Sequence, residues 1–169
     1  MKRMMVIGGA AAVLALSVGL VVNGTLADDD PPASAEKDQK ILRPDELAWQ
    51  DGPPSLPDGA RMVLLHGDLD EKGTLALRLE VPAGYEVPPH WHPADENVTI
   101  LEGTVVFGMG DKIDPKVEKA LPPGGFFRMP AKHRHYARAE TDAVVQIHSG
   151  GPWGINYVNP EDDPRGSSK

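Results

Sequence analysis

The sequence predicts an all-β domain, built as an antiparallel sandwich, barrel or jelly roll, and three observations lead to that prediction. Glycine and proline are abundant, with 18 and 17 residues among 169, which favours short strands and many turns over helices. From Ala60 onward, short apolar runs alternate with turn residues. One run, Thr74–Val81, alternates apolar and polar side chains along its whole length, as a half-buried strand does. The length suits one domain and leaves little room for a second.

The N-terminal residues predict an export signal. A basic pair, Lys2-Arg3, precedes the uncharged and mostly apolar run Met4–Val22, and the small residues Thr25 and Ala27 follow. Residues 1–27 therefore have the pattern of a secretory signal peptide that is cleaved after Ala27. The apolar run is also just long enough to span a membrane, so an uncleaved membrane tether is the alternative. Either arrangement places the folded part outside the cytoplasm, in the periplasm or the extracellular medium.

Residues 28–59 are expected to form a tether and an N-terminal arm. The tether, residues 28–42, is polar, contains Pro31-Pro32 and lacks apolar periodicity, which indicates disorder. After it, Pro44 stands where it can open one helical turn. Trp49 then reaches the main domain, where we expect it to pack.

The main domain, residues 60–158, is expected to hold the strands. The predicted strands are Met62–Leu65, Thr74–Val81, Asn97–Leu101, Thr104–Met109, Gly125–Met129 and Ala143–His148. Between them, sequences such as Glu102-Gly103 and Pro122-Pro123-Gly124-Gly125 predict turns. The only stretch that favours a helix is Pro115–Ala120, which Asp114 precedes. Residues 159–169 are expected to form a solvated C-terminal tail.

Charge and composition exclude several function classes. The net charge is −8, and removal of the signal would take away two basic residues. An acidic chain without a basic stripe predicts no nucleic-acid partner. The absence of cysteine excludes disulfides, thiolate metal ligands and cysteine nucleophiles. No phosphate-binding glycine loop, dinucleotide fingerprint or nucleophile elbow is present.

The most informative stretch contains two histidines at alternate positions. His90 and His92 would point to the same face of a strand, about 6.6 Å apart along the backbone. Two imidazoles at that spacing can converge on one metal ion. After Pro93 ends the strand pattern, a return of the chain could bring the carboxylate of Glu96 to the same ion. Trp91 would face the other way and pack.

The spacing around these histidines resembles that of the cupin superfamily. The first cupin motif is matched without departure by Gly84, His90, His92, Glu96 and Gly103. The second motif is matched by Gly124, Pro130 and His135. Two positions depart from it, because Lys132 stands where glycine is usual and Ala139 stands where asparagine is usual.

The resemblance covers roughly residues 60–157, and it implies a double-stranded β-helix, the jelly-roll barrel of cupins, around one metal ion. Carried over by position, the metal ligands would be His90, His92, Glu96 and His135. Such a site keeps one or two coordination positions open, as catalytic metal sites do. The ion would be one divalent metal, with Zn, Cu, Fe, Ni and Mn all compatible with these ligands.

Other polar residues are weaker candidates. Gln146 and His148 share one face of a predicted strand, and Arg78 lies on the polar face of another. We treat Arg78, Gln146 and His148 as candidates for contacts with a substrate or with the metal ligands, and their orientation toward barrel or solvent stays open. His133 is interpreted as a surface histidine of a loop. The aromatic residues Tyr85, Phe107, Phe126, Phe127 and Trp153 are interpreted as packing residues.

Two functions follow from this interpretation. The first is a mononuclear metalloenzyme that acts on a small organic molecule as a dioxygenase, isomerase or decarboxylase, within the oxidoreductases, isomerases or lyases. The alternative is an exported, non-catalytic protein that binds a small ligand or a metal. Both imply a small-molecule partner and no membrane partner after signal cleavage, and a homodimer is left open.

Overall fold

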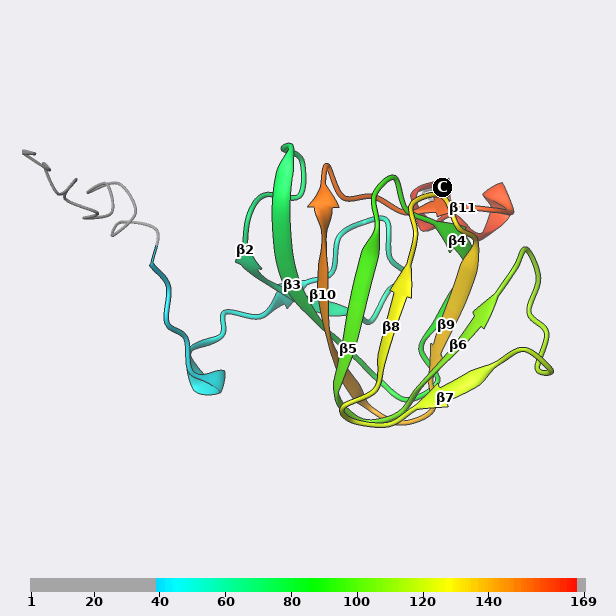
Figure 1. Cartoon of the computed structure of the whole chain (residues 1–169), viewed down its shortest axis with the longest axis horizontal. Coiled ribbons are helices and arrows are strands. Elements are labelled where there is room, and N and C mark those ends of the chain that lie inside the picture. Colours follow the sequence, from blue (N-terminus) through cyan, green and yellow to red (C-terminus); the bar gives the residue numbers. More distant parts are fainter. Residues whose placement is uncertain (1–38, 167–169) are drawn as a thin grey trace, which may run out of the picture. The chain divides into compact units, whose positions relative to one another are not determined.

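The computed structural model describes residues 39–166, in which the chain forms two antiparallel sheets. The six-stranded sheet has the order β1-β2-β3-β10-β5-β8, and the five-stranded sheet has the order β11-β4-β9-β6-β7. The two sheets curve around a common interior (Figure 1). This architecture confirms the predicted all-β jelly-roll barrel. The expected signal, residues 1–27, lies outside the described residues.

Eleven strands and three short 3₁₀ helices make up the described chain. The bounds of the strands are β1 Gln50–Asp51, β2 Arg61–His66, β3 Gly73–Val81, β4 Glu86–Trp91, β5 Glu96–Glu102, β6 Val105–Met109, β7 Lys119–Leu121, β8 Phe126–Met129, β9 His135–Ala139, β10 Ala143–Gly151 and β11 Asn156–Tyr157. The 3₁₀ helices are η1 Pro44–Glu46, η2 Pro160–Asp162 and η3 Pro164–Gly166.

The alternating pattern of β3 fixes the inner face of the six-stranded sheet. β10 pairs with β3 so that Leu79 lies opposite Val145 and Leu77 opposite Ile147. These apolar side chains are buried in the core, and Leu77 has no exposed surface. Because neighbouring residues of a strand point to opposite faces, the side chains between them lie on the outer face of the sheet.

The six strands expected in the main domain are all present, with ends that differ by a few residues. The prediction of a helix at Pro115–Ala120 is wrong. The chain makes a single turn there, with the amide of Val117 bonded to the carbonyl of Asp114 at 3.1 Å, and then continues as β7. Ala120 lies opposite Val106 of β6, so strand pairing replaces a helix that would have been too short to be stable.

The strand that precedes the histidine pair is irregular where its prolines lie. β4 pairs with β9, and the register shifts between Val87 and His90. Pro88 and Pro89 occupy this shift, and proline has no amide hydrogen for a ladder bond. The bulge therefore accommodates the prolines, and regular pairing resumes at His90, which lies opposite His135.

Gly103 shows why the first motif needs glycine at its end. It has a positive φ of 73°, and a Cβ atom placed there would lie 2.1 Å from the carbonyl oxygen of Asp142. A side chain is therefore excluded both by the backbone conformation and by a close approach. The turn that Gly103 makes connects β5 to β6, which belong to different sheets.

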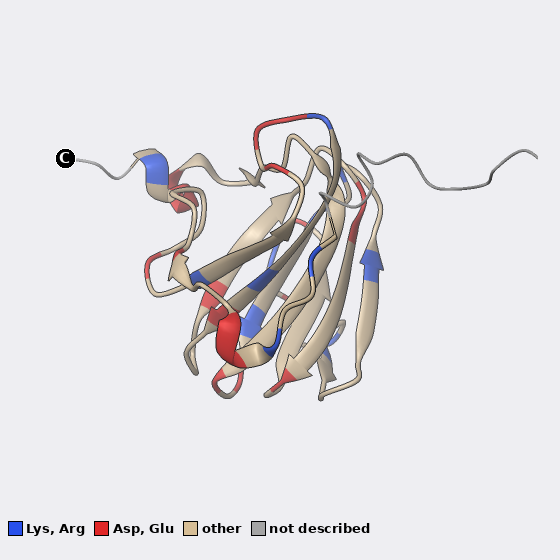
Figure 2. Ribbon diagram, turned by 90° about the vertical axis from the view of Figure 1, so that its left-hand side faces the viewer, with Lys and Arg blue, Asp and Glu red and all other residues tan. Residues whose placement is uncertain are grey.

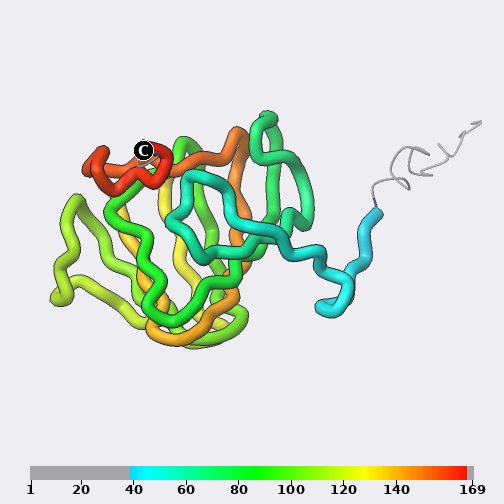
Figure 3. The backbone as a smooth tube through the Cα atoms, turned by 180° about the vertical axis from the view of Figure 1, so that it is seen from behind, coloured from blue at the N-terminus to red at the C-terminus, as the bar shows by residue number. Residues whose placement is uncertain are grey.

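Residues 50–59, which precede the main domain, are joined to the barrel. Pro44 occupies the first turn of η1, as predicted, and β1 pairs with β2. The loop 52–59, which connects β1 to β2, lies against the body of the fold (Figure 3). Its carbonyls at Ser55 and Pro57 accept hydrogen bonds from the hydroxyls of Tyr157 and Tyr85. These bonds hold Leu56 in the core, where it is 5% exposed.

Acidic and basic residues are interspersed on the face shown in Figure 2. At the C-terminal end, the short helices η2 and η3 are held by Arg165, which contacts Asp163 and donates to the carbonyl of Ile155 at 2.9 Å. Across the described part of the chain, we find no helix with the length and apolar character needed to cross a membrane.

Candidate metal centre

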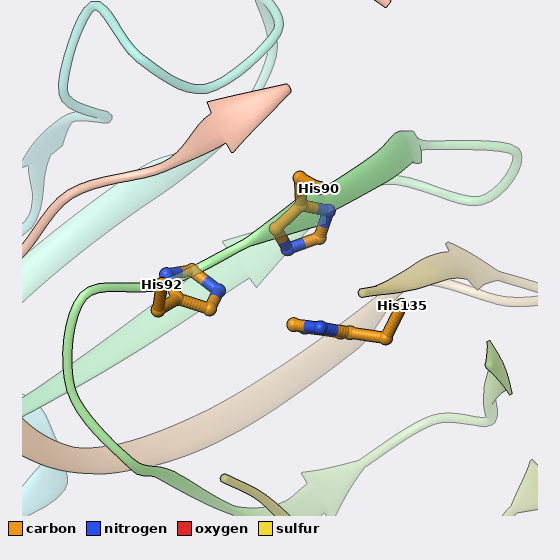
Figure 4. A group of neighbouring side chains, drawn as sticks. All are labelled: His90, His92 and His135. Atoms are coloured by element: carbon orange, nitrogen blue, oxygen red, sulfur yellow. The ribbon is translucent and has the colours of Figure 1, made fainter. Parts of the chain in front are cut away.

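Three buried imidazoles converge at one end of the barrel interior. His90 lies in β4, His92 directly follows that strand, and His135 begins β9 beside it. Their rings point toward one another (Figure 4). One ring nitrogen from each lies within 4.8 Å of those of the other two. The residues are only 4%, 3% and 1% exposed, so the cluster is a feature of the interior.

The carboxylate of Glu96 joins this cluster from β5, across the barrel. Its Oε2 atom lies 3.5 Å from Nε2 of His92 and 3.5 Å from Nε2 of His135. Two donors that share a tetrahedral ion, with bonds of ~2.0–2.2 Å, lie about 3.4 Å apart. The spacing of Glu96 from two of the imidazoles is therefore that of donors around one small ion.

Backbone carbonyls fix the orientation of all three rings. The Nδ1 atoms of His90, His92 and His135 lie 2.7, 2.8 and 3.1 Å from the carbonyl oxygens of Pro88, Gly154 and His133. Because a carbonyl only accepts, each Nδ1 carries the hydrogen. Each Nε2 is then the atom with a lone pair for a metal.

A second, independent observation indicates that the donor set could hold a metal ion. The Nε2 atom of His92 is buried and has no hydrogen-bond partner among the described residues. A buried polar atom without a partner is costly, so such atoms are rare. A metal ion at the centre of the cluster would satisfy it.

The environment of His90, His92 and Glu96 favours the protonation states that bind metal. Burial lowers the pKa of His90 well below its usual value, and His135 and His92 lower it further. Burial also lowers the pKa of His92, although the charge of Glu96 opposes this. For Glu96, burial raises the pKa, but His92 and His135 outweigh burial and hold the pKa below its usual value. Neutral imidazole and ionised carboxylate are the states in which these groups bind metals.

The four donors open onto an apolar cavity with about 80 Å³ of free volume. Its walls come from both sheets, as apolar side chains such as Val98, Phe107, Val145 and Ile147 show. A volume of this size exceeds the ~10–15 Å³ that one water needs. The cavity can therefore hold a small molecule beside the donor set.

Four aromatic residues that the sequence suggested only for packing line this cavity, and two of them lie next to the histidines. Trp153 stacks on His92, with ring centroids 5.7 Å apart and planes inclined by 23°. Phe127 approaches His135, with centroids 6.2 Å apart. Trp153 lies far from the histidine motifs in the sequence, so no local spacing could have linked it to them.

The other candidate polar residues do not reach the donor set. Val145 and Ile147 of β10 line the cavity, so Gln146 and His148 lie on the opposite face of the strand. Arg78 lies opposite Gln146 in β3 and donates to its Oε1 atom at 3.0 Å. Strand alternation therefore directs Arg78, Gln146 and His148 to the outer face of the sheet, which answers the question of orientation that the sequence left open.

The loop before His135 accommodates Lys132, one of the two departures from the second motif. Lys132 has a positive φ of 65°, the conformation for which glycine is the usual residue at this position. Its amide donates to the carbonyl of His92 at 2.8 Å, so the turn still connects the two histidine strands. His133 is exposed in this loop, as expected.

Comparison with known proteins supports the fold and the motifs. The family model described as a cupin domain matches residues 77–149. No curated protein matches the chain.

Solved structures share the architecture at low sequence identity. KdgF from Halomonas sp. is 22% identical, covers 66% of this chain and 93% of its own, and has a TM-score of 0.52. The polyketide cyclase RemF from Streptomyces resistomycificus is 15% identical, with coverages of 75% and 90% and a TM-score of 0.60. A candidate acetylacetone dioxygenase from Methylibium petroleiphilum is 20% identical, with coverages of 75% and 85% and a TM-score of 0.58. These likenesses concern the fold.

Proposed function

We propose that this chain, whose residues 77–149 match the cupin-domain model, is a cupin that binds one divalent metal ion through His90, His92, Glu96 and His135. We propose further that it is a metalloenzyme for a small organic molecule. The observation that carries the proposal is the common orientation of the imidazoles. Each Nδ1 is engaged by a carbonyl, and the buried Nε2 of His92 lacks a partner.

The residues of the chain define what such a centre can do. Three imidazoles and one carboxylate would fill a tetrahedral ion, so open positions require an ion that takes five or six ligands. Such an ion can act as a Lewis acid or as a redox centre. The barrel walls around the donors are mostly apolar, so they would favour an apolar molecule beside the ion. The names of two similar structures, a polyketide cyclase and a candidate acetylacetone dioxygenase, support a small organic substrate.

The cavity wall offers little acid–base chemistry of its own. Apart from the four donors, its titratable residues among those described are Tyr85 and Arg138. Tyr85 donates its hydroxyl hydrogen to the carbonyl of Pro57 at 2.7 Å, and Arg138 pairs with Glu118 at 3.1 Å. A reaction in this cavity would therefore depend on the ion. The same observation favours the second candidate function, a protein that binds a small ligand without turnover.

We place the mature protein outside the cytoplasm, with cleavage after Ala27 as the export route. There the ion would be acquired from the surroundings, and imidazole-rich sites bind Cu²⁺ and Zn²⁺ more tightly than Mn²⁺ or Fe²⁺. Zn or Cu should therefore dominate in protein isolated from its own compartment. Mass spectrometry of that protein should find an N-terminus at Asp28, and stoichiometric Mn or Fe with only traces of Zn and Cu would overturn the assignment of the ion.

The proposal is tested by metal content and metal affinity. The wild-type chain should carry about one ion and lose affinity by more than ~10-fold on His135→Ala, since changes merely next to metal ligands cost 10–100-fold. His133→Ala is the matched control, because His133 lies in the same segment but is exposed. Equal affinities for the two variants would contradict the proposed site. Turnover with loaded protein, absent in the His135→Ala variant, separates the enzyme from the binding protein.

A further inference from the structure

The donor set fixes the charge of a loaded centre. Imidazoles bind metals in their neutral form, and Glu96 contributes one negative charge. A divalent ion on these donors therefore leaves one uncompensated positive charge. In an apolar interior, such a charge is costly unless an anion neutralises it.

The cavity itself provides no compensating anion. Apart from the metal donors, Arg138 is the only charged residue among the described residues that line the cavity, and its charge is positive. Its guanidinium lies 3.1 Å from Glu118 and 3.6 Å from Glu140. Its neighbours in β9, Ala137 and Ala139, belong to the packed interior. Because neighbouring residues of a strand point to opposite faces, the Arg138 side chain points outward and pairs with these acidic residues. Arg138 is therefore not available to hold a second ligand anion.

Trp153, which stacks on the proposed metal ligand His92, carries a hydrogen-bond donor without an acceptor. The Nε1 atom of Trp153 is buried and has no partner, and it shares this state only with Nε2 of His92 among the described side chains. The two residues stack, and the backbone amide of Trp153 is fixed to the carbonyl of Leu69 at 2.7 Å. Buried polar atoms without a hydrogen-bond partner are costly, and each of the two residues, which stack on each other, lacks one partner. One would be the ion, and the other would be an acceptor on a molecule bound to it.

We propose that the cavity takes a small molecule with an apolar body that binds as a monoanion through oxygen, and that the indole N–H of Trp153 donates a hydrogen bond to it. This rests on the proposed metal centre, because the ion supplies the positive charge. A neutral molecule would leave that charge unbalanced, and a dianion would place a new excess charge among apolar walls. Trp153, which packs against the core, would thus also be a ligand-binding residue.

A matched series of probes tests the charge selection. Isobutyrate is a monoanion with an apolar body, isobutyramide is its neutral analogue, and methylmalonate is the dianion in which a carboxylate replaces a methyl group. Zn²⁺-loaded protein, with its metal content measured first, is titrated with each probe by calorimetry. Isobutyrate should bind at least about 10-fold more tightly than the other two, as expected for an interaction with a buried charge. Metal-free protein should bind none of them.

Two tryptophan variants test the hydrogen bond. Trp153→Phe keeps an aromatic ring but removes the donor, and it should weaken isobutyrate binding about 10-fold while leaving the Zn²⁺ content unchanged. Trp91→Phe is the control, because Trp91 follows His90 in β4 and faces away from the donors; it should change neither quantity.

Each result decides a different part. A chain that takes up no metal overturns the proposed function and this inference with it. A loaded chain that binds isobutyramide or methylmalonate as tightly as isobutyrate overturns the charge selection alone. A loaded Trp153→Phe variant with unchanged isobutyrate affinity overturns the role of Trp153.

Discussion

Lys132 adopts a backbone conformation that L-residues with side chains rarely take. Its φ of 65° costs a residue with a Cβ atom roughly 1 kcal/mol. Lys132→Gly should therefore raise the free energy of unfolding relative to Lys132→Ala, in which the strain remains, by up to about 1 kcal/mol. Urea unfolding of the two metal-free variants measures the difference. An alanine variant at least as stable as the glycine variant would show that the turn is not strained.

The buried histidines also make stability depend on pH. In the folded chain the pKa values of His90 and His92 lie below 6.5, their usual value in an unfolded chain. Below pH ~6.5 the unfolded chain therefore binds protons that the folded chain does not, and the free energy of unfolding falls as the pH falls. We expect metal-free protein to be equally stable at pH 8 and 7 and progressively less stable toward pH 5. Urea unfolding at each pH measures this, and constant stability from pH 7 to 5 would be incompatible with neutral buried imidazoles.

At the scale of the elements, sequence patterns predicted the strands with clear apolar alternation. β3 and β10 are examples, because Leu77, Leu79, Val145 and Ile147 mark one buried face. β9 was not predicted, since its inner residues include His135 and alanines and its outer residues are Tyr136 and Arg138. Its strand conformation comes from pairing with β4 and β6, which are remote in sequence. The strand propensity of a segment does not depend on which remote strands will pair with it, so it could not predict β9.

The proposed metal ligands could be predicted because their signal is local in the sequence, whereas the signal for β9 is not. His90, His92 and Glu96 stand at a spacing that a strand and a turn convert directly into proximity, and His135 has its place in a second motif. The carbonyl of Gly154 and the ring of Trp153 reach His92 from a distant segment. Their contribution depends on how the chain returns to β4 through β11, and this is a property of the tertiary structure.

The outer face of the six-stranded sheet carries a group of hydrogen-bonded polar side chains that should not affect metal binding. Arg78, Gln146 and His148 form a chain of hydrogen bonds on that face, with Gln146 Nε2 2.8 Å from His148 Nε2. These side chains and the cavity lie on opposite faces of the six-stranded sheet, so His148→Ala should change metal affinity less than twofold. Metal titration of this variant beside His135→Ala measures the contrast. A loss for His148→Ala comparable to that of His135→Ala would mean that the two faces of β10 are assigned the wrong way round.

At the scale of the whole molecule, the barrel should not depend on its ion for folding. Large apolar side chains from both sheets, such as Leu77, Ile100 and Val105, form a core to which none of the four donors belongs. Removal of the ion by a chelator should leave a cooperative thermal transition at a lower midpoint. Bound metal at 100 times its dissociation constant adds only about 2.7 kcal/mol to the stability. Loss of the transition itself would mean that the centre holds the fold together.

Anomalous diffraction from a crystal of the metal-loaded protein locates the ion directly. The account predicts one peak inside the barrel, ~2.0–2.2 Å from Nε2 of His90, His92 and His135 and from a carboxylate oxygen of Glu96. Data collected from a His135→Ala crystal soaked in the same metal should show this peak weakened or absent. A peak bonded to Nδ1 atoms, a peak on the outer face near His148, or no ordered ion in the barrel of the loaded wild-type chain would contradict the account.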